Sequence, residues 1–419
     1  MTRSIVGTAG TRVLVTVMNL MVVMAAGHAL GAEGVGSVSL IVLGAAMILL
    51  AMNVMSGGGS VYLTPRSGTE VLRWPAYGWT LLIGAISLGI LQWVPLVPAE
   101  WALPVVAIAV SQGLLNTHLG LLLGRQRIAL HNGLLVLQSG LLAVLFFLFL
   151  RTDGAQVMDY VHSAYVAFGS TVVLSGILSY RHRSKGHCSL AEACAQLLRQ
   201  GIPAQAANAL QLINYRFAYL LVERANGIAG LGLFSVTTQL AEGTWLVPKS
   251  IGMVLYTRVS NDGPSREQVG IALTALKASV ASAALAALVL IMVPDGVYRW
   301  LFGASISGLW SMLLLMTPGL LAMAASQVLS HYLSGAGRVM QNALSSGTGA
   351  LVTLGLGSVL IPTYGLHGAA ITTSCAYLAS TAQQWVVFRR LTGSRLKELL
   401  PSRSDVVALH TLLGRSLGR

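Results

Sequence analysis

Twelve runs of mostly apolar residues, each about long enough to cross a bilayer, dominate this sequence. A transmembrane helix needs roughly 20 such residues, and in lipid only helices and closed barrels satisfy their own backbone hydrogen bonds. We therefore expect an all-α polytopic membrane protein with twelve transmembrane helices. The expected helices are Ile5–Ala29, Gly36–Met55, Ala76–Val97, Leu103–Leu123, Ile128–Leu150, Val157–Tyr180, Leu198–Leu221, Gly227–Tyr256, Val269–Val293, Ser307–Leu329, Met340–Ile361 and Leu366–Phe388.

The composition excludes a soluble fold. Only 9% of the 419 residues are charged and 55% are hydrophobic, whereas soluble domains carry about 25% charged residues. Arg12 interrupts the first apolar run and no convincing cleavage site follows, so a helix is predicted there and not a signal peptide. Cys188, Cys194 and Cys375 have neither the even number of a disulfide framework nor the spacing of metal ligands. We expect no metal site.

Basic residues alternate between dense and sparse loops. With a cytoplasmic N-terminus, nineteen of the 26 lysines and arginines lie on the cytoplasmic side and three lie outside. The positive-inside rule therefore predicts that both termini are cytoplasmic. Because this topology accounts for most of the net charge of +13, no nucleic-acid partner is expected. The loop Arg181–His187 and the tail after Phe388 are expected to contact anionic membrane lipids.

The chain contains an internal repeat. The stretch ALGAEGVGSVS at Ala29–Ser39 recurs as ANGIAGLGLFS at Ala225–Ser235, with an alanine, three glycines and a serine in common. Six expected spans separate the copies, so the two halves have the same orientation, as in the parallel repeats of some transporters. We expect two six-helix lobes, 1–180 and 198–388, joined by a cytoplasmic linker at 181–197 and followed by a basic tail at 389–419.

Charged residues inside the expected spans are the candidate functional residues. A charge at a helix centre costs at least about 2.5–3.5 kcal/mol, so such residues usually face a cavity or a bundle interior. Three polar stripes with helical spacing contain most of them, and we expect a polar cavity between the lobes. The stripes are Gln205, Asn208, Gln211, Tyr215, Arg216 and Tyr219; Ser235, Gln239, Glu242 and Lys249; and Thr8, Arg12, Thr16 and Asn19.

The cationic residues indicate an anionic ligand. Arg216 and Lys277 have no acidic residue in their own expected helix, and a guanidinium pairs bidentately with phosphate or carboxylate. The predicted substrate-binding residues are Arg216, Lys277, Arg12, Lys249, Gln205, Asn208, Gln211 and Tyr215. Two alternatives stay open: Arg12 could reach the cytoplasmic headgroups, and Glu242 could form a structural pair with Lys249.

Six stretches, in their order and spacing, resemble one family of transporters across nearly the whole chain. They are ALGAEGVGSVSL, GGGSVYLTPR, NYRFAYLLVERANGIAGLGLFSVTTQLAEG, VLYTRVS, HYLSGAGR and YGLHGAAITTSCAY. These stretches resemble the polysaccharide flippases of the O-antigen (Wzx) type, which belong to the MOP exporter superfamily with the MATE exporters and the lipid II flippase MurJ.

The resemblance implies that the protein moves an undecaprenyl-pyrophosphate-linked oligosaccharide to the outer leaflet of a bacterial inner membrane by alternating access. The product would serve lipopolysaccharide, capsule or exopolysaccharide biosynthesis, with a polysaccharide polymerase and chain-length proteins as partners. Arg216 stands at the arginine of the family's asparagine-aromatic-arginine stretch. Where members commonly have an aspartate two residues later, this chain has Ala218, so ion coupling cannot use that acid here.

Two rival functions were weighed against a flippase. A MATE-like exporter of small molecules would use unpaired membrane acids, for which only Glu242 and Asp159 are available. These two are also the candidates for proton or sodium coupling. A polysaccharide polymerase or ligase normally needs a large outer loop, and every expected outer loop is short. No nucleophile–base set, metal cluster or phosphate-binding loop is visible, so no enzyme activity and no cofactor are expected.

Overall fold

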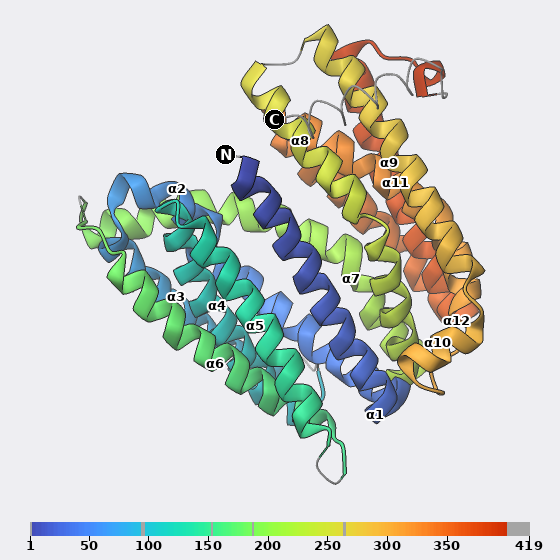
Figure 1. Ribbon diagram of the computed structural model, residues 1–419, viewed down its shortest axis with the longest axis horizontal. Helices are drawn as coiled ribbons and strands as arrows, with labels where there is room; N and C mark the ends of the chain where they lie inside the picture. The colour runs from blue at the N-terminus through green and yellow to red at the C-terminus, as the bar shows by residue number, and fades with distance from the viewer. Residues whose placement is uncertain (1, 94–96, 152–153, 187, 263–264, 400–419) are drawn as a thin grey trace. The chain divides into compact units, whose positions relative to one another are not determined.

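The computed structural model describes residues 2–93, 97–151, 154–186, 188–262 and 265–399, and these are helical apart from short connections. The elements in chain order are α1 (Thr2–Ser56), α2 (Gly58–Ser67), α3 (Thr69–Trp93), η1 (Ala99–Trp101), α4 (Ala102–Gly124), α5 (Ile128–Phe149), α6 (Val157–Arg181), α7 (Leu190–Gly243), α8 (Leu246–Asp262), α9 (Arg266–Met292), α10 (Asp295–Phe302), α11 (Leu309–Gly335), α12 (Val339–Thr392) and η2 (Leu396–Leu399) (Figure 1).

Three of these elements are each two helices that a single glycine joins. Gly31 in α1, Gly227 in α7 and Gly365 in α12 have φ of 68°, 72° and 58°, a region that only glycine adopts at low cost. Eight helices are long and apolar enough to span a membrane, and two of them are long enough to do so twice. With α8 continuing the second half of α7, the described chain contains the twelve expected transmembrane helices, and the predicted fold class is confirmed.

The internal repeat is visible in the backbone. Gly31 and Gly227 occupy equivalent positions of the two sequence copies, and their ψ angles are −169° and −179°. Both copies therefore turn from one helix into the next through the same glycine conformation. The likeness of the two copies in sequence follows from this shared turn.

The repeated glycines also pack against each other's copy reciprocally. A Cβ on Gly36 would lie 2.8 Å from the carbonyl carbon of Ile228, and a Cβ on Gly232 would lie 2.8 Å from that of Ala32. Both distances are shorter than real Cβ contacts. The two pairs are related by the same offset in sequence, so the contact between the two helix starts is reciprocal. Glycine is required because backbone meets backbone there.

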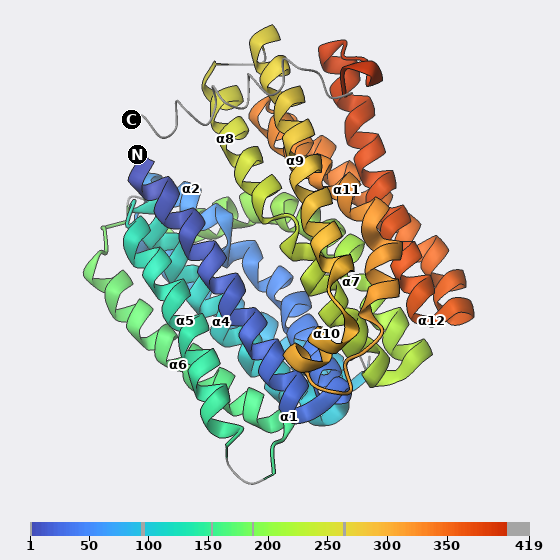
Figure 2. The ribbon, with the colours of Figure 1, turned by 45° about the vertical axis from the view of Figure 1, so that its right-hand side comes forward.

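The contacts divide the chain into two compact units. The first unit contains residues 1–209, 228–233 and 299–306. In it, α4 packs against α3 and α6, and α5 packs against α6 (Figure 2). The end of α10 belongs to this unit because the Trp300 carbonyl oxygen lies 2.7 Å from His28 Nε2.

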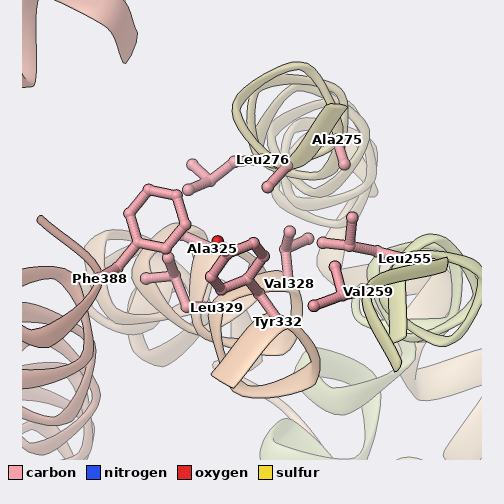
Figure 3. Close-up of a cluster of buried hydrophobic side chains, with 10 residues drawn as sticks. Leu255, Val259, Ala275, Leu276, Ala325, Val328, Leu329, Tyr332 and Phe388 are labelled. Carbon is pink, nitrogen blue, oxygen red and sulfur yellow. The ribbon is translucent and has the colours of Figure 1, made fainter. Parts of the chain in front are cut away.

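The second unit contains residues 210–227, 234–298 and 307–419, as far as they are described. Helix α11 packs against α8, α9 and α12 and lies at the centre of this unit. Its core includes Leu255, Leu276, Leu329, Tyr332 and Phe388, whose side chains converge from four helices (Figure 3). The division by contacts falls inside α7, after Ala209, whereas the sequence predicted that the second lobe begins at residue 198.

Candidate functional site

Arg216 and Glu242 form an ion pair inside the second unit. Arg216 lies in the first half of α7 and Glu242 near the end of its second half, and the turn at Gly227 brings the two halves together. Arg216 Nη1 lies 2.7 Å from Glu242 Oε1, and about a quarter of each side chain is exposed. The glutamate oxygen is buried and accepts no well-aligned hydrogen bond from the described residues. The attraction of the two opposite charges at this distance holds the pair together.

A tyrosine and a threonine fix the arginine in place. Arg216 Nη1 donates to the Tyr219 hydroxyl at 2.9 Å, and the guanidinium carbon lies 5.1 Å from the centre of the Tyr219 ring. The Tyr219 hydroxyl is hydrogen-bonded to Thr238 Oγ1, which itself donates to the Phe234 carbonyl oxygen at 3.0 Å. Tyr219 and Thr238 are both buried. The guanidinium thus has a fixed orientation and still has N–H groups that these contacts do not use.

Three aromatic rings lie beside the ion pair. Tyr215, Trp245 and Tyr377 have their ring centres 5.5–6.1 Å apart in each combination. Lys249 Nζ lies 5.8 Å from the centre of the Trp245 ring, on an exposed side chain. Among the described residues, the buried Trp245 Nε1 has no hydrogen-bond acceptor. An unpaired buried donor is rare enough to indicate either a functional role or a missing partner.

Of the alternatives left open by the sequence, the pairing of Glu242 with Lys249 is not the one the structure shows, because Glu242 pairs with Arg216. The sequence predicts one continuous helix over 227–256, in which Glu242 and Lys249 share a face. The structure instead ends α7 at Gly243 and begins α8 at Leu246. Hydrogen bonds from the Thr244 and Trp245 amides to the carbonyls three residues earlier form this break. The break changes the helical register, so the two residues no longer lie one above the other.

The other predicted residues of α7 belong to both units. Asn208 Nδ2 donates to Gln205 Oε1 at 3.1 Å within the first unit. In the second unit, Gln211 Nε2 donates weakly to the Tyr215 hydroxyl at 3.4 Å. Gln205 and Asn208 thus form an amide pair of the first unit, whereas Gln211, Tyr215, Arg216 and Tyr219 belong to the second unit.

Three further candidates lie on helices other than α7 and α8. Arg12 is exposed on α1 in the first unit, where its carbonyl accepts a hydrogen bond from Thr16 Oγ1 at 2.8 Å. Lys277 is half-buried on α9, a helix that contributes no member of the cluster. Asp159 caps the start of α6, since its Oδ2 accepts a hydrogen bond from the Gln156 amide at 2.8 Å. This capping contact gives Asp159 a structural role.

Sequence reasoning missed several members of the cluster. Tyr377 comes from α12, far along the chain, and no pattern near Arg216 indicates it. Thr238 has the helical spacing of Ser235 and Glu242 but was not included in the stripe, and Trp245 lies at the helix break that the sequence pattern did not predict. Within the described residues, histidine, cysteine and acidic side chains form no group of three or more that could hold a metal ion.

No protein-family model matches the chain, and no curated protein matches it by sequence. Solved structures do share its fold. An inward-facing multidrug resistance MATE family transporter of the MOP superfamily has a TM-score of 0.73 at 17% identity, covering 90% of this chain and 94% of that one.

The lipid II flippase MurJ in an inward closed conformation has a TM-score of 0.75 at 13% identity, covering 97% and 92% of the two chains. A MOP superfamily transporter from Pyrococcus furiosus, for which reverse polarity of the binding pocket suggests a different function, has a TM-score of 0.62 at 16% identity, covering 94% and 95%. At these identities the likeness shows a shared fold. The chain is a multi-pass membrane protein with the fold of MOP superfamily transporters.

Proposed function

We propose that the protein is a flippase that moves an undecaprenyl-pyrophosphate-linked oligosaccharide from the inner to the outer leaflet of a bacterial inner membrane. The product would serve O-antigen, capsule or exopolysaccharide synthesis. The fold shared with MurJ, which is a lipid II flippase, supports transport of a lipid-linked substrate. The sequence stretches that resemble the Wzx family support a polysaccharide substrate in particular, with a polymerase and chain-length proteins acting next.

The ion pair is the observation that carries this proposal. It brings Glu242 against Arg216, so the cluster of Arg216, Glu242 and Lys249 has a net charge of +1. Such a cluster suits an anionic headgroup. Arg216 still offers free N–H donors, and Trp245 Nε1 offers a buried one. Both would donate to phosphate or sugar oxygens.

The mechanism we propose is an exchange of partners at Arg216. The pyrophosphate or an acidic sugar would compete with Glu242 for the guanidinium, while Tyr219 keeps that guanidinium oriented. The isoprenoid tail would stay in lipid and the headgroup with its sugars in the polar site, because moving the charged headgroup into lipid or the apolar tail into water is costly. Alternating access would then expose the headgroup on the outer side. A proton or sodium gradient could act on the same exchange by neutralising Glu242.

A MATE-like exporter of organic cations is the second candidate, because a MATE transporter shares the fold equally well. Such an exporter needs a carboxylate that is available to a cationic drug. In this chain Arg216 already neutralises Glu242, and Asp159 is engaged at the start of α6. These contacts favour the flippase over the exporter.

The test is lipid analysis of a strain that lacks the protein and is complemented with variants. Arg216→Ala should abolish glycan export and cause the pyrophosphate-linked glycan to accumulate in the inner leaflet, because each lost charged hydrogen bond costs about 1.5–3 kcal/mol. Arg216→Lys should rescue export in part, since the charge remains without the planar fork.

The matched control is Arg224→Ala, which removes an exposed arginine from the same half of α7. It should leave export unchanged. Normal export by well-expressed Arg216→Ala would refute the anion site. Altered drug tolerance with normal lipid pools would instead support the exporter.

A further inference from the structure

The first unit has a second cationic site, at the end where α2 meets the beginning of α7. A cavity of about 350 Å³ lies there, lined by α2 and by the first turns of α7. It lies wholly within the first unit. This site shares no residue with the Arg216 cluster, and the inference drawn from it does not rest on the function proposed above.

Close packing gives the cavity fixed walls. A Cβ on Gly201 would lie 2.6 Å from the carbonyl carbon of Val54, so the two backbones are in contact beside the cavity. Ser67 Oγ donates to Gln196 Oε1 at 3.0 Å and ties α2 to α7 directly. Leu197, fully buried, anchors the apolar side of α7 in the core of this unit. The polar side of the same turns is left to line the cavity.

The charges in the cavity favour an anion. Arg66 and Arg199 line it, and within the described residues neither forms an ion pair with a carboxylate. Arg66 Nη1 donates to the Tyr62 carbonyl oxygen at 2.7 Å, which uses one of the five N–H groups of its side chain. The one acid in the lining, Glu192, accepts a hydrogen bond from Gln196 at 3.2 Å. The lining therefore carries a net positive charge with several unused donors.

The residues around the cavity indicate that it lies at the depth of the lipid headgroups. Tyr62, Trp74 and Tyr180 are 49%, 68% and 55% exposed at this end of the unit. Hydrogen bonds between Thr69 and Ser184, at 2.7 and 3.1 Å, bring the basic segment after α6 to the same end. Exposed aromatic residues together with arginines and lysines are typical of the interface between membrane and water. The charge distribution predicts that this is the cytoplasmic interface.

We propose that this cavity binds the phosphate-ester headgroup of a membrane lipid, with Arg66 and Arg199 as the phosphate-binding groups. Two guanidiniums at headgroup depth match a phosphate through charged, paired hydrogen bonds. The guanidinium carbon of Arg66 lies 3.8 Å from the centre of the Tyr62 ring, and this stacking holds the guanidinium in place at the cavity. An anionic phospholipid and a polyprenyl pyrophosphate share this chemistry.

Cys188 offers a direct probe, because it lines the cavity and is a free thiol. Substitution of Cys194 and Cys375 by alanine leaves Cys188 as the only thiol of the full-length protein. Its rate of alkylation by a maleimide would be measured in detergent micelles with added phosphatidylglycerol, phosphatidylcholine, polyprenyl pyrophosphate or inorganic pyrophosphate. Bound headgroup should slow the reaction, since it covers the cavity.

We expect phosphatidylglycerol to slow the labelling of Cys188. Arg66→Gln or Arg199→Gln should raise the lipid concentration that gives half-maximal protection by about tenfold, as expected for the loss of one charged contact. Arg338→Gln is the same change in an exposed residue of the second unit, and it should leave this lipid concentration unaltered. Protection by polyprenyl pyrophosphate alone would identify the transported lipid as the ligand. Protection by inorganic pyrophosphate would show that the cavity binds a free anion. Equal protection by phosphatidylcholine, or none by any ligand, would overturn the proposal.

Discussion

Removal of the carboxylate from the Arg216–Glu242 pair should destabilise the second unit measurably. The two charged atoms are 2.7 Å apart and both side chains are about a quarter exposed. Loss of one partner of a fully buried pair costs about 3–5 kcal/mol, and the partial exposure reduces this to roughly 2 kcal/mol. For a unit of this size, roughly 2 kcal/mol lowers the melting temperature by about 4–8 °C. Glu242→Gln should therefore lower the melting temperature of the purified protein by that amount.

A double-mutant cycle separates the pair from other effects of each substitution. Glu242→Gln, Arg216→Gln and the double variant would be melted in the same detergent, followed by the fluorescence of the tryptophans. We expect a coupling energy of roughly 2 kcal/mol, with the double variant more stable than the sum of the single changes predicts. Glu70→Gln is the matched control, since it breaks a 3.5 Å pair with Arg183 whose side chains are 41% and 49% exposed. That pair should contribute at most about 1 kcal/mol.

A coupling energy within about 0.5 kcal/mol of zero would refute the pairing of Arg216 with Glu242, because independent sites are additive to that accuracy. If the coupling energy of Glu70 with Arg183 were as large as that of Glu242 with Arg216, burial would not determine the strength of these ion pairs. The same variants also test coupling to transport. If Glu242 competes with the substrate for Arg216, well-expressed Glu242→Gln should bind the substrate more tightly and lose dependence of export on the gradient.

The glycine crossing and the topology give two further predictions. Gly36→Ala should destabilise the protein by about 1–3 kcal/mol, because the new methyl group meets the Ile228 carbonyl, whereas Gly58→Ala, with open space around it, should be neutral or slightly stabilising. If Gly36→Ala leaves the melting temperature unchanged, the backbone at Gly36 is not closely packed against Ile228. Labelling of single cysteines from the two sides of the membrane should place Arg224 outside and Lys185 inside, and an inside result at Arg224 would contradict the predicted topology.

The sequence allowed the helices to be predicted but not the charge pairing. The length of the apolar runs was enough to predict the spans. The repeated stretch contains both turn glycines, Gly31 and Gly227, but the sequence pattern did not identify them as the turns. Periodicity shows which residues share a helix face. It does not show which helix faces another, so the partner of Arg216 remained unknown. The short break before Leu246 was also missed, although Gly243 ends α7 and Pro248 follows in the first turn of α8.

The pairing of Arg216 with Glu242 bears on how a flippase could release its substrate. An unpaired arginine in a desolvated site would hold a pyrophosphate tightly, and tight binding slows release. A fixed carboxylate 2.7 Å away competes with the phosphate on every cycle, so the net affinity is the difference between two ion pairs. The guanidinium keeps its orientation in both states through Tyr219, and only the anion is exchanged. Under the proposed function, Glu242 is therefore the group that makes binding of the substrate anion at Arg216 reversible.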